Sequence, residues 1–160
     1  MPIEKRPVDL AEICRGVLEE IGAAHPSRSF EFSASEDTTG VWDPDRLAQA
    51  VSNLVSNAVN HGRAESPIIA RVIDEGPRVG FSINNQGEPT PAEKIAHIFD
   101  PFHRGASAGG GRSGGLGLGL YITDQIVRAH RGRLTVESDA VHGTTFAVTL
   151  PRIPPPRPAT

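Results

Sequence analysis

The order of the apolar patterns along this chain limits its fold more than any other feature of its sequence. Segments with the spacing of amphipathic helices and segments with the alternation of half-buried strands follow one another without strict βαβ alternation. A strand hairpin precedes the last helix, and two further strands follow that helix. We therefore expect an α+β fold, a two-layer α/β sandwich in which a mixed, mostly antiparallel sheet carries its helices on one face.

Capping and turn residues set the bounds of these elements. Asp43 offers a helix N-cap with Pro44 in the first helical position, and Gly132 suits the C-terminal end of the last helix. Four helices are predicted. The first starts at Asp9 or Leu10 and runs through Ile21, and the others span Pro44 to about Asn60, Pro91 to Ile98 and Leu118 to His130. The predicted strands are a short edge strand around Val8, then Ser29–Ser33, Val41–Trp42, Pro67–Ile73, Arg78–Asn84, Arg133–Ser138 and Thr144–Leu150. In the hairpin, the candidates for burial are Ile69, Val72, Val79, Phe81 and Ile83.

Composition excludes several classes of protein. The chain has 160 residues and a hydrophobic fraction of 38%, which suits one domain with a proper core. A net charge of −3 gives no basic footprint for nucleic acid or for an anionic membrane surface. Cys14 has no cysteine to pair with and is expected to fill the core. No apolar run is long enough to cross a bilayer or to act as a signal peptide, so we expect a cytoplasmic domain, whose parent protein could be membrane-anchored.

A glycine-rich stretch, SGGLGLGLYI, spans Ser113–Ile122 and leads into the last helix. Glycines let backbone amides approach a polyanion closely, and a helix that starts just afterwards adds its positive end. The preceding run of Gly, Ala, Ser and Arg cannot pack a core and is expected to be a mobile lid. Taken alone, such a stretch equally fits a linker or a tight turn, so it is only a weak indication of phosphate binding.

Two asparagines, Asn53 and Asn57, stand one turn apart beside the apolar stripe of the second predicted helix. Asparagine is a mediocre helix former, so the pair needs a reason. One interpretation is that both side chains are solvated or bonded to a loop. The other is that their amide oxygens hold Mg²⁺ together with phosphate oxygens and water.

Four motifs and a closing strand occur in one order, and together they resemble the ATP-binding catalytic domain of bacterial sensor histidine kinases, which has the GHKL or Bergerat fold. NLVSNAVNHG resembles the asparagine box of that family, NNQGEPTP its first glycine box, FDPF its phenylalanine box and GGLGLGLYI its second glycine box. GTTFAVTLP resembles the closing strand. The resemblance covers nearly the whole chain, and the ordered set is far more specific than any one motif.

The resemblance implies a role for each matching position. It implies ATP and Mg²⁺ as the ligands, with Asn57 as the metal ligand and Asn53 and Arg104 as the catalytic residues. Asn53 would lie near the phosphates, with His61 close behind, and Arg104 would contact the terminal phosphate. The remaining implied contacts are Asn85, Gly87 and Thr144 at the adenine, and Gly115, Leu116, Gly117, Leu118 and Gly119 in the phosphate cradle. An arginine fork, a cation and glycine amides are the means by which proteins stabilise a transferring phosphoryl group.

The first glycine box departs from the family pattern at two positions. The family usually has Asp where this chain has Asn85, and a second Gly where it has Pro89. An Asp carboxylate only accepts hydrogen bonds, whereas an Asn amide accepts or donates according to its orientation. Adenine selectivity is therefore expected to be looser. A branch of sensor kinases that includes phytochrome-like ones similarly reads Asn-x-Gly, so Asn85 does not indicate inactivity, and Asn85→Asp is expected to keep or strengthen ATP binding.

The sequence lacks the phosphoacceptor that the resemblance implies. None of its six histidines is followed by an acidic residue, so the domain is expected to transfer phosphate to a histidine on a separate helical dimerisation domain, in the parent chain or in trans. A response regulator would be an indirect partner; nucleic acid and direct membrane contact are not expected. One alternative is an anti-sigma-factor-like serine kinase, which prefers Glu at the position of Asn53, as do stand-alone ATPases that use it as a general base. A non-catalytic nucleotide-binding module is a further alternative.

The resemblance and the composition together predict one domain and a tail. Residues 1–151 are expected to form the ATP-binding catalytic domain. Residues 152–160, RIPPPRPAT, are too rich in proline to fold alone and are expected to be disordered.

Overall fold

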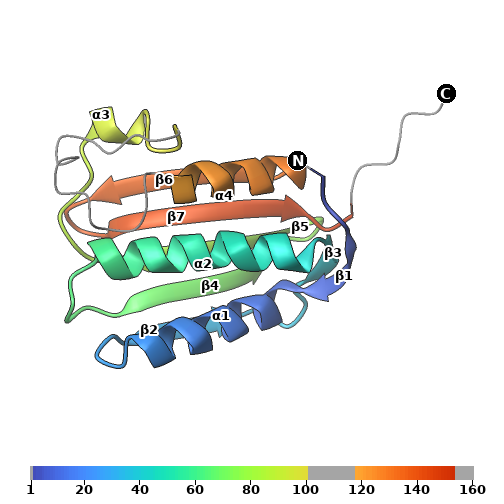
Figure 1. The fold of residues 1–160 in the computed structure, drawn as a ribbon, viewed down its shortest axis with the longest axis horizontal. Helices are drawn as coiled ribbons and strands as arrows, with labels where there is room; N and C mark the ends of the chain where they lie inside the picture. Colours follow the sequence, from blue (N-terminus) through green and yellow to red (C-terminus); the bar gives the residue numbers. More distant parts are fainter. Residues whose placement is uncertain (1, 101–117, 154–160) are drawn as a thin grey trace.

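A five-stranded mixed sheet forms the back layer of the molecule (Figure 1). The computed structural model describes residues 2–100 and 118–153. Strand β2 runs parallel to β4, and the pairs β4–β5, β5–β7 and β6–β7 are antiparallel. In spatial order the strands are β2 (Phe30–Ala34), β4 (Ile68–Asp74), β5 (Arg78–Asn85), β7 (Gly143–Pro151) and β6 (Arg133–Asp139).

Three long helices cover one face of this sheet (Figure 1). They are α1 (Leu10–Ala24), α2 (Pro44–His61) and α4 (Leu118–Ala129), and α2 packs between the other two. A short helix, α3 (Ala92–Ile95), follows the hairpin. The predicted α+β sandwich with helices on one face is confirmed.

A separate two-stranded sheet lies beside the main one. Strand β1 (Arg6–Asp9) pairs antiparallel with β3 (Thr39–Trp42), so the predicted strand at Val8 is one of the two strands of this small sheet and does not belong to the large one. Trp42 connects the two sheets, because its ring is 1% exposed and its Nε1 donates a hydrogen bond to the carbonyl of Pro151 over 2.9 Å.

Side-chain caps begin α1 and α2 as the sequence predicts. The Asp9 carboxylate accepts from the amide of Ala11, and the Asp43 carboxylate accepts from the amides of Asp45 and Arg46. These bonds satisfy backbone donors that have no partner inside the helix. The start of α2, and hence the rotation of its asparagines about the helix axis, is therefore fixed locally.

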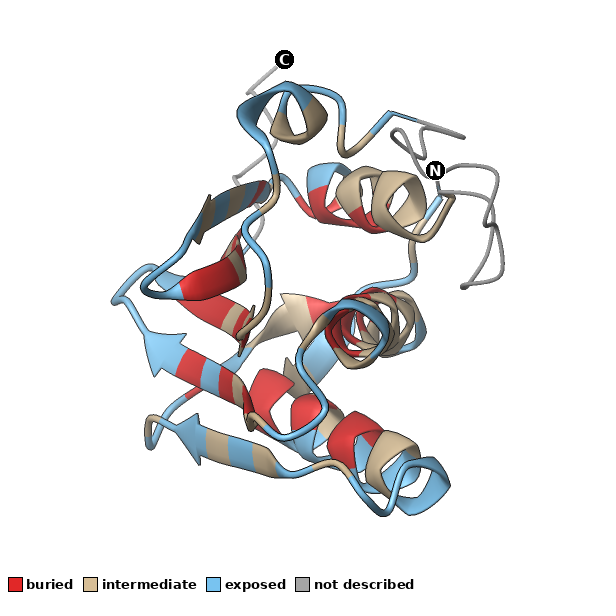
Figure 2. Cartoon of the chain, turned by 90° about the vertical axis from the view of Figure 1, so that its left-hand side faces the viewer, coloured by how far each residue is buried: buried red, intermediate tan, exposed pale blue. Residues whose placement is uncertain are grey.

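The hydrophobic core lies between the helices and the sheet, where Figure 2 shows the buried residues concentrated. In β5, Val79, Phe81 and Ile83 are buried and face the helices, as predicted. Cys14 is fully buried, which confirms its core role, and burial raises the pKa of its thiol. No helix within residues 2–100 and 118–153 is both long and apolar enough to cross a membrane.

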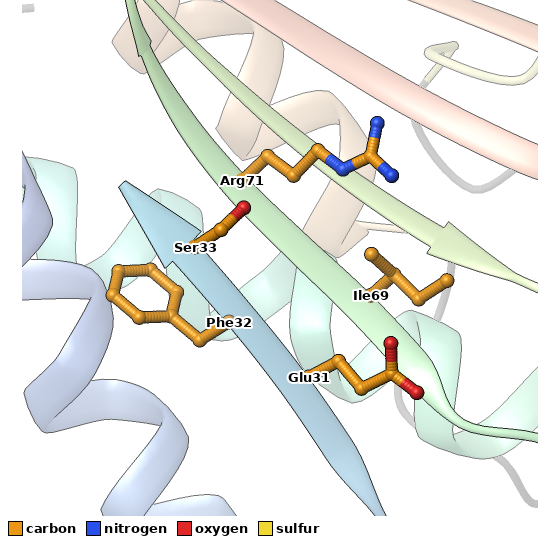
Figure 3. Close-up of a pocket in the computed structure, with 5 residues that line it drawn as sticks. All are labelled: Glu31, Phe32, Ser33, Ile69 and Arg71. Carbon is orange, nitrogen blue, oxygen red and sulfur yellow. The ribbon is translucent and has the colours of Figure 1, made fainter. Parts of the chain in front are cut away.

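The predicted burial of Ile69 is wrong. Successive residues of a strand point to opposite faces, and Ile68 and Ala70 take the core side of β4. Ile69 instead lines a hollow on the face of the sheet that carries no helix, together with Glu31, Ser33 and Arg71 (Figure 3). None of the predicted site residues lines this hollow.

Candidate nucleotide-binding site

A strip of polar side chains runs along α2. Asn53, Asn57 and His61 follow one another at four-residue intervals, so they share one side of the helix. Asn53 is half-buried, and its Nδ2 donates to the carbonyl of Gly119 over 3.2 Å and to Oγ1 of Thr123 over 3.3 Å. Thr123 is fully buried, and its hydroxyl donates to the same Gly119 carbonyl over 2.8 Å. These bonds fasten the middle of α2 to the first turns of α4.

The start of α4 is suited to a polyanion. The helix begins at Leu118, and a Cβ built on Gly119 would lie 3.8 Å from Cγ of Asn53. Because the first amides of a helix have no partner inside it and lie at its positive end, they attract phosphate oxygens. The structure thus brings Asn53 and Gly119 together at the start of α4, and the binding of phosphate there remains a prediction.

Asn57 has its amide free for a ligand. Its side chain is half-buried and hydrogen-bonds to no residue in the described ranges, in contrast to that of Asn53 one turn earlier. Its oxygen therefore fits Mg²⁺, which prefers oxygen ligands and keeps waters and substrate phosphate oxygens in its shell. Within the described residues, no group of three or more His, Cys, Asp or Glu is placed to hold a metal, so a cation here would depend on Asn57, water and phosphate.

The base side of the site lies at the end of β5. Asn85 is 5% exposed and pairs in register with Thr144 on β7. Gly143 has φ +77°, and a Cβ there would lie 2.2 Å from the Asn85 carbonyl oxygen, so only glycine fits beside it. The hydroxyl of Thr144 is 2.8 Å from that of Ser138, whose oxygen accepts from the amide of Thr90 over 2.7 Å. Asn85 and Thr144 are therefore held side by side, and their contact with adenine remains a prediction.

The end of α2 touches the loop that follows β5. A Cβ on Gly87 would lie 3.1 Å from the carbonyl oxygen of His61, and the amide of Arg63 donates to the carbonyl of Gln86 over 2.7 Å. The pKa of the His61 imidazole lies below its ordinary value because of desolvation and the positive charge of Lys94. His61 is therefore neutral at pH 7, with a ring nitrogen able to accept or donate a hydrogen bond.

Several predicted site residues lie outside the described part of the chain. They fall within 101–117: Arg104, Gly115, Leu116, Gly117, the predicted lid and the end of the FDPF motif. Their roles remain predictions.

Sequence reasoning missed three residues of this region. Thr123 was missed because the hydroxyl of a threonine in a helix usually bonds to a backbone carbonyl of the same helix, so it gives no sign of a contact with another helix. Ser138 was missed because it resembles any polar residue on a strand. Arg28 was missed because it stands in a turn after α1, yet its Nη1 donates to the carbonyl of Val59 near the end of α2. The four-residue spacing from Gly119 to Thr123, which lets the hydroxyl reach the Gly119 backbone carbonyl, is the one local signal that could have indicated Thr123.

Known proteins resemble this chain in sequence and in fold. Residues 42–154 match the model of the family described as "Histidine kinase-, DNA gyrase B-, and HSP90-like ATPase". A bacteriophytochrome of Pseudomonas aeruginosa is 33% identical over 145 residues, which are 89% of this chain and 20% of that protein. The chain spans between 14% and 36% of the length of the curated relatives that it matches.

Solved structures agree with the fold. The catalytic domain of histidine kinase ThkA, in a nucleotide-free form, is 28% identical with a TM-score of 0.82, covering 95% of this chain and 98% of that one. Full-length ShkA in complex with AMPPNP is 26% identical with a TM-score of 0.79, covering 94% of this chain and 32% of that one. By its match to the family model and its likeness to these catalytic domains, the chain belongs to the histidine kinase-, DNA gyrase B- and HSP90-like ATPase family, as a catalytic domain of the histidine kinase type.

Proposed function

We propose that this domain binds Mg-ATP and donates the γ-phosphoryl group to a histidine on a separate dimerisation and phosphoacceptor domain, within a two-component signalling system. The observation that carries the proposal is the bond from the Asn53 amide to the Gly119 carbonyl at the start of α4. It holds a strip of amide side chains beside the positive end of a helix, which suits a triphosphate. The likeness to ShkA, solved in complex with AMPPNP, supports the binding of a nucleotide.

Each part of the site has a role in the proposal. The oxygen of Asn57 ligates Mg²⁺, which when bound neutralises charge on the β- and γ-phosphates. Asn53 positions the phosphates against the start of α4, and His61 lies behind them. The base contacts are Asn85, Gly87 and Thr144; the cradle is Gly115, Leu116, Gly117, Leu118 and Gly119; and Arg104 contacts the terminal phosphate.

Transfer to a protein histidine is favoured over hydrolysis because of the chemistry of Asn53. An ATPase of this family needs a carboxylate there to take a proton from water, and a neutral amide does not accept one. A histidine imidazole is itself a nucleophile and needs no such base. The proposed partners are therefore the helical phosphoacceptor domain directly and a response regulator indirectly, in the cytoplasm.

Calorimetry on Asn57 variants tests the binding step. We expect the wild type to bind Mg-ATP with a Kd on the order of micromolar to millimolar, and more weakly when EDTA replaces Mg²⁺. Asn57→Ala should remove most of this dependence on Mg²⁺. The matched control is Gln49→Ala on the same helix, whose side chain bonds to Arg46 at the far end from Gly87 and should leave binding unchanged. An Asn57→Ala protein with an unaltered response to Mg²⁺ would refute the metal assignment.

Labelled ATP tests the transfer step. The domain is incubated with γ-labelled ATP, with and without a helical phosphoacceptor domain from a sensor kinase. Transfer to histidine gives an acid-labile, base-stable phosphoprotein that appears only with the acceptor. Acid-stable phosphoserine on a sigma-antagonist partner would identify a serine kinase instead, and release of inorganic phosphate at the same rate without any acceptor would identify an ATPase.

A further inference from the structure

A buried guanidinium at the end of α2 has donors to spare. Arg28 stands between α1 and β2, and its Nη1 donates to the Val59 carbonyl over 2.9 Å. Its Nε and Nη2 are buried and have no hydrogen-bond partner among the described residues. A guanidinium keeps its charge and offers five N–H donors, and buried donors without an acceptor are costly. An acceptor close to Nη2 would remove this cost.

The side chain of Asn85 lies nearby, although it makes no hydrogen bond to Arg28 among the described residues. A Cβ built on Gly62 would lie 3.0 Å from Cβ of Asn85 and 3.3 Å from Nη2 of Arg28, so the two side chains flank the space that this glycine leaves open. Asn85 stands two positions after the core residue Ile83 on β5, so both side chains point to the helix layer. The amide of Asn85 bonds to no described residue. An unsatisfied donor and an unsatisfied amide thus lie on either side of Gly62.

The chemistry of the pair decides which end of the amide meets a ligand. Arg28 only donates, whereas Asn85 has one oxygen that accepts and one NH₂ that donates. Pairing with Arg28 uses the oxygen and turns the NH₂ toward the base. A donor there opposes the 6-amino group of adenine, which also donates, and complements the 6-oxo group of hypoxanthine or guanine, which accepts.

We propose that Arg28 is a positioning residue that orients the Asn85 amide, so that the base pocket accepts 6-oxo purine nucleoside triphosphates at least as well as ATP. The inference rests on the proposed function, because it places the base at Asn85.

Calorimetry with Mg-ATP and Mg-ITP tests the proposal, since these two nucleotides differ only in the purine edge at positions 1 and 6. The wild type should bind ITP as tightly as ATP or more tightly. Arg28→Met, which has no donors, frees the amide to turn over, and the affinity ratio should move toward ATP by roughly three- to tenfold. Asn85→Asp only accepts, so it can serve both Arg28 and adenine, and it should favour ATP by tenfold or so.

Two controls separate orientation from structural support. Arg71→Met makes the same chemical change on the helix-free face of the sheet and should alter neither affinity. Arg28→Met also loses the bond to the Val59 carbonyl, so circular dichroism is used to check that this variant remains folded. If Arg28→Met is unfolded, Asn85→Asp, which keeps that bond, provides the test.

The outcomes distinguish this inference from the proposed function. Wild-type binding of ATP tenfold tighter than ITP overturns the inference and leaves the function standing. A folded Arg28→Met protein in which both affinities fall equally also overturns it, because Arg28 would then only support the helix end. If the folded wild type binds neither ATP nor ITP, the inference and the proposed function are both overturned.

Discussion

At the scale of single residues, the two asparagines of α2 show that one residue type can have two roles, depending on its position. Asn53 spends its Nδ2 on the Gly119 carbonyl and on the Thr123 hydroxyl, which fixes its orientation and leaves its oxygen for a ligand. Asn57, one turn later, has no such bond within the described residues. The first amide therefore joins α2 to α4, and the second is the one that we propose to bind Mg²⁺.

Gly119→Ala tests the close approach at the start of α4. The new methyl would make an ordinary contact, 3.8 Å from Cγ of Asn53, and alanine stabilises a helix over glycine by roughly 0.5–1 kcal/mol. We therefore expect unchanged or higher thermal stability. Mg-ATP affinity should fall by about tenfold because the methyl covers amides that face the phosphates.

The control is Gly16→Ala in α1, where an added Cβ meets nothing within 4 Å. It should give a similar gain in melting temperature with no change in affinity. If calorimetry found Gly119→Ala binding Mg-ATP as tightly as the wild type, the phosphate contact assigned to this turn would be wrong.

At the scale of elements, a buried histidine joins the end of α4 to the start of α2. Nε2 of His130 accepts from the amide of Asp43 over 3.0 Å, and Nδ1 is 2.8 Å from the Ile126 carbonyl, to which it donates. One ring nitrogen accepts and the other donates, so the imidazole is neutral. Because Asp43 caps α2, this ring couples the two helices that carry Asn53 and Gly119.

The His130 linkage predicts a loss of stability in mild acid. Burial is the main cause that lowers the pKa of this imidazole in the folded protein. As pH falls below the ordinary histidine value of about 6.5, the unfolded chain binds a proton that the folded chain does not, so the free energy of unfolding decreases. Urea denaturation at pH 7.5 and pH 5.5 measures this decrease.

His130→Gln isolates the contribution of this one residue. The variant should lose roughly 1–3 kcal/mol at pH 7.5, because a glutamine amide does not place an acceptor and a donor as the imidazole does, and it should depend less on pH than the wild type. His61, whose pKa is also lowered, acts in the same direction in both proteins and cancels in the comparison. Equal pH dependence in wild type and variant would show that His130 is not the titrating group.

At the scale of the whole molecule, local patterns predicted the elements and could not predict how distant ones pair. The β4–β5 hairpin was predictable because its turn, Asp74 to Pro77, is written in the sequence. The parallel β2–β4 pair joins strands separated by the whole of α2, and the β1–β3 sheet leaves no local signal of its independence. Adjacent Ile68 and Ile69 likewise could not reveal which of them faces the core until the register was known.

The site was predictable as far as its motifs extend. Asn53 and Asn57 were found by their helical spacing, and the ordered motifs then gave them chemical meaning. Arg28 and Thr123 carry no motif, because their roles arise from contacts with segments 31 and 70 positions away in the sequence. Non-local packing of this kind has no periodicity to detect.

Arg152 ties the two sheets together at the end of the molecule opposite the candidate site. Its guanidinium donates to the Gly76 and Thr39 carbonyls and pairs with Asp74 and Asp37, while its side chain is only 16% exposed. It thus bonds the β4–β5 turn to β3 and to the loop before it. Since β5 starts beside this cluster and ends at the base pocket, stability and binding are located at opposite ends of one strand.

Arg152→Ala should therefore lower stability and leave nucleotide binding unchanged. Loss of the bonds to the three carbonyls of Gly76, Thr39 and Asp37 should cost roughly 1–3 kcal/mol of unfolding free energy in urea denaturation. Amide exchange should rise first in β3, where the Val41 amide donates to the Arg152 carbonyl. Arg133→Ala, an exposed arginine on β6, controls for loss of surface charge and should stay within about 0.5 kcal/mol of wild type. A fall in Mg-ATP affinity in the folded Arg152→Ala protein would show that the small sheet and the base pocket are coupled through β5, and that the two ends of the strand do not act independently.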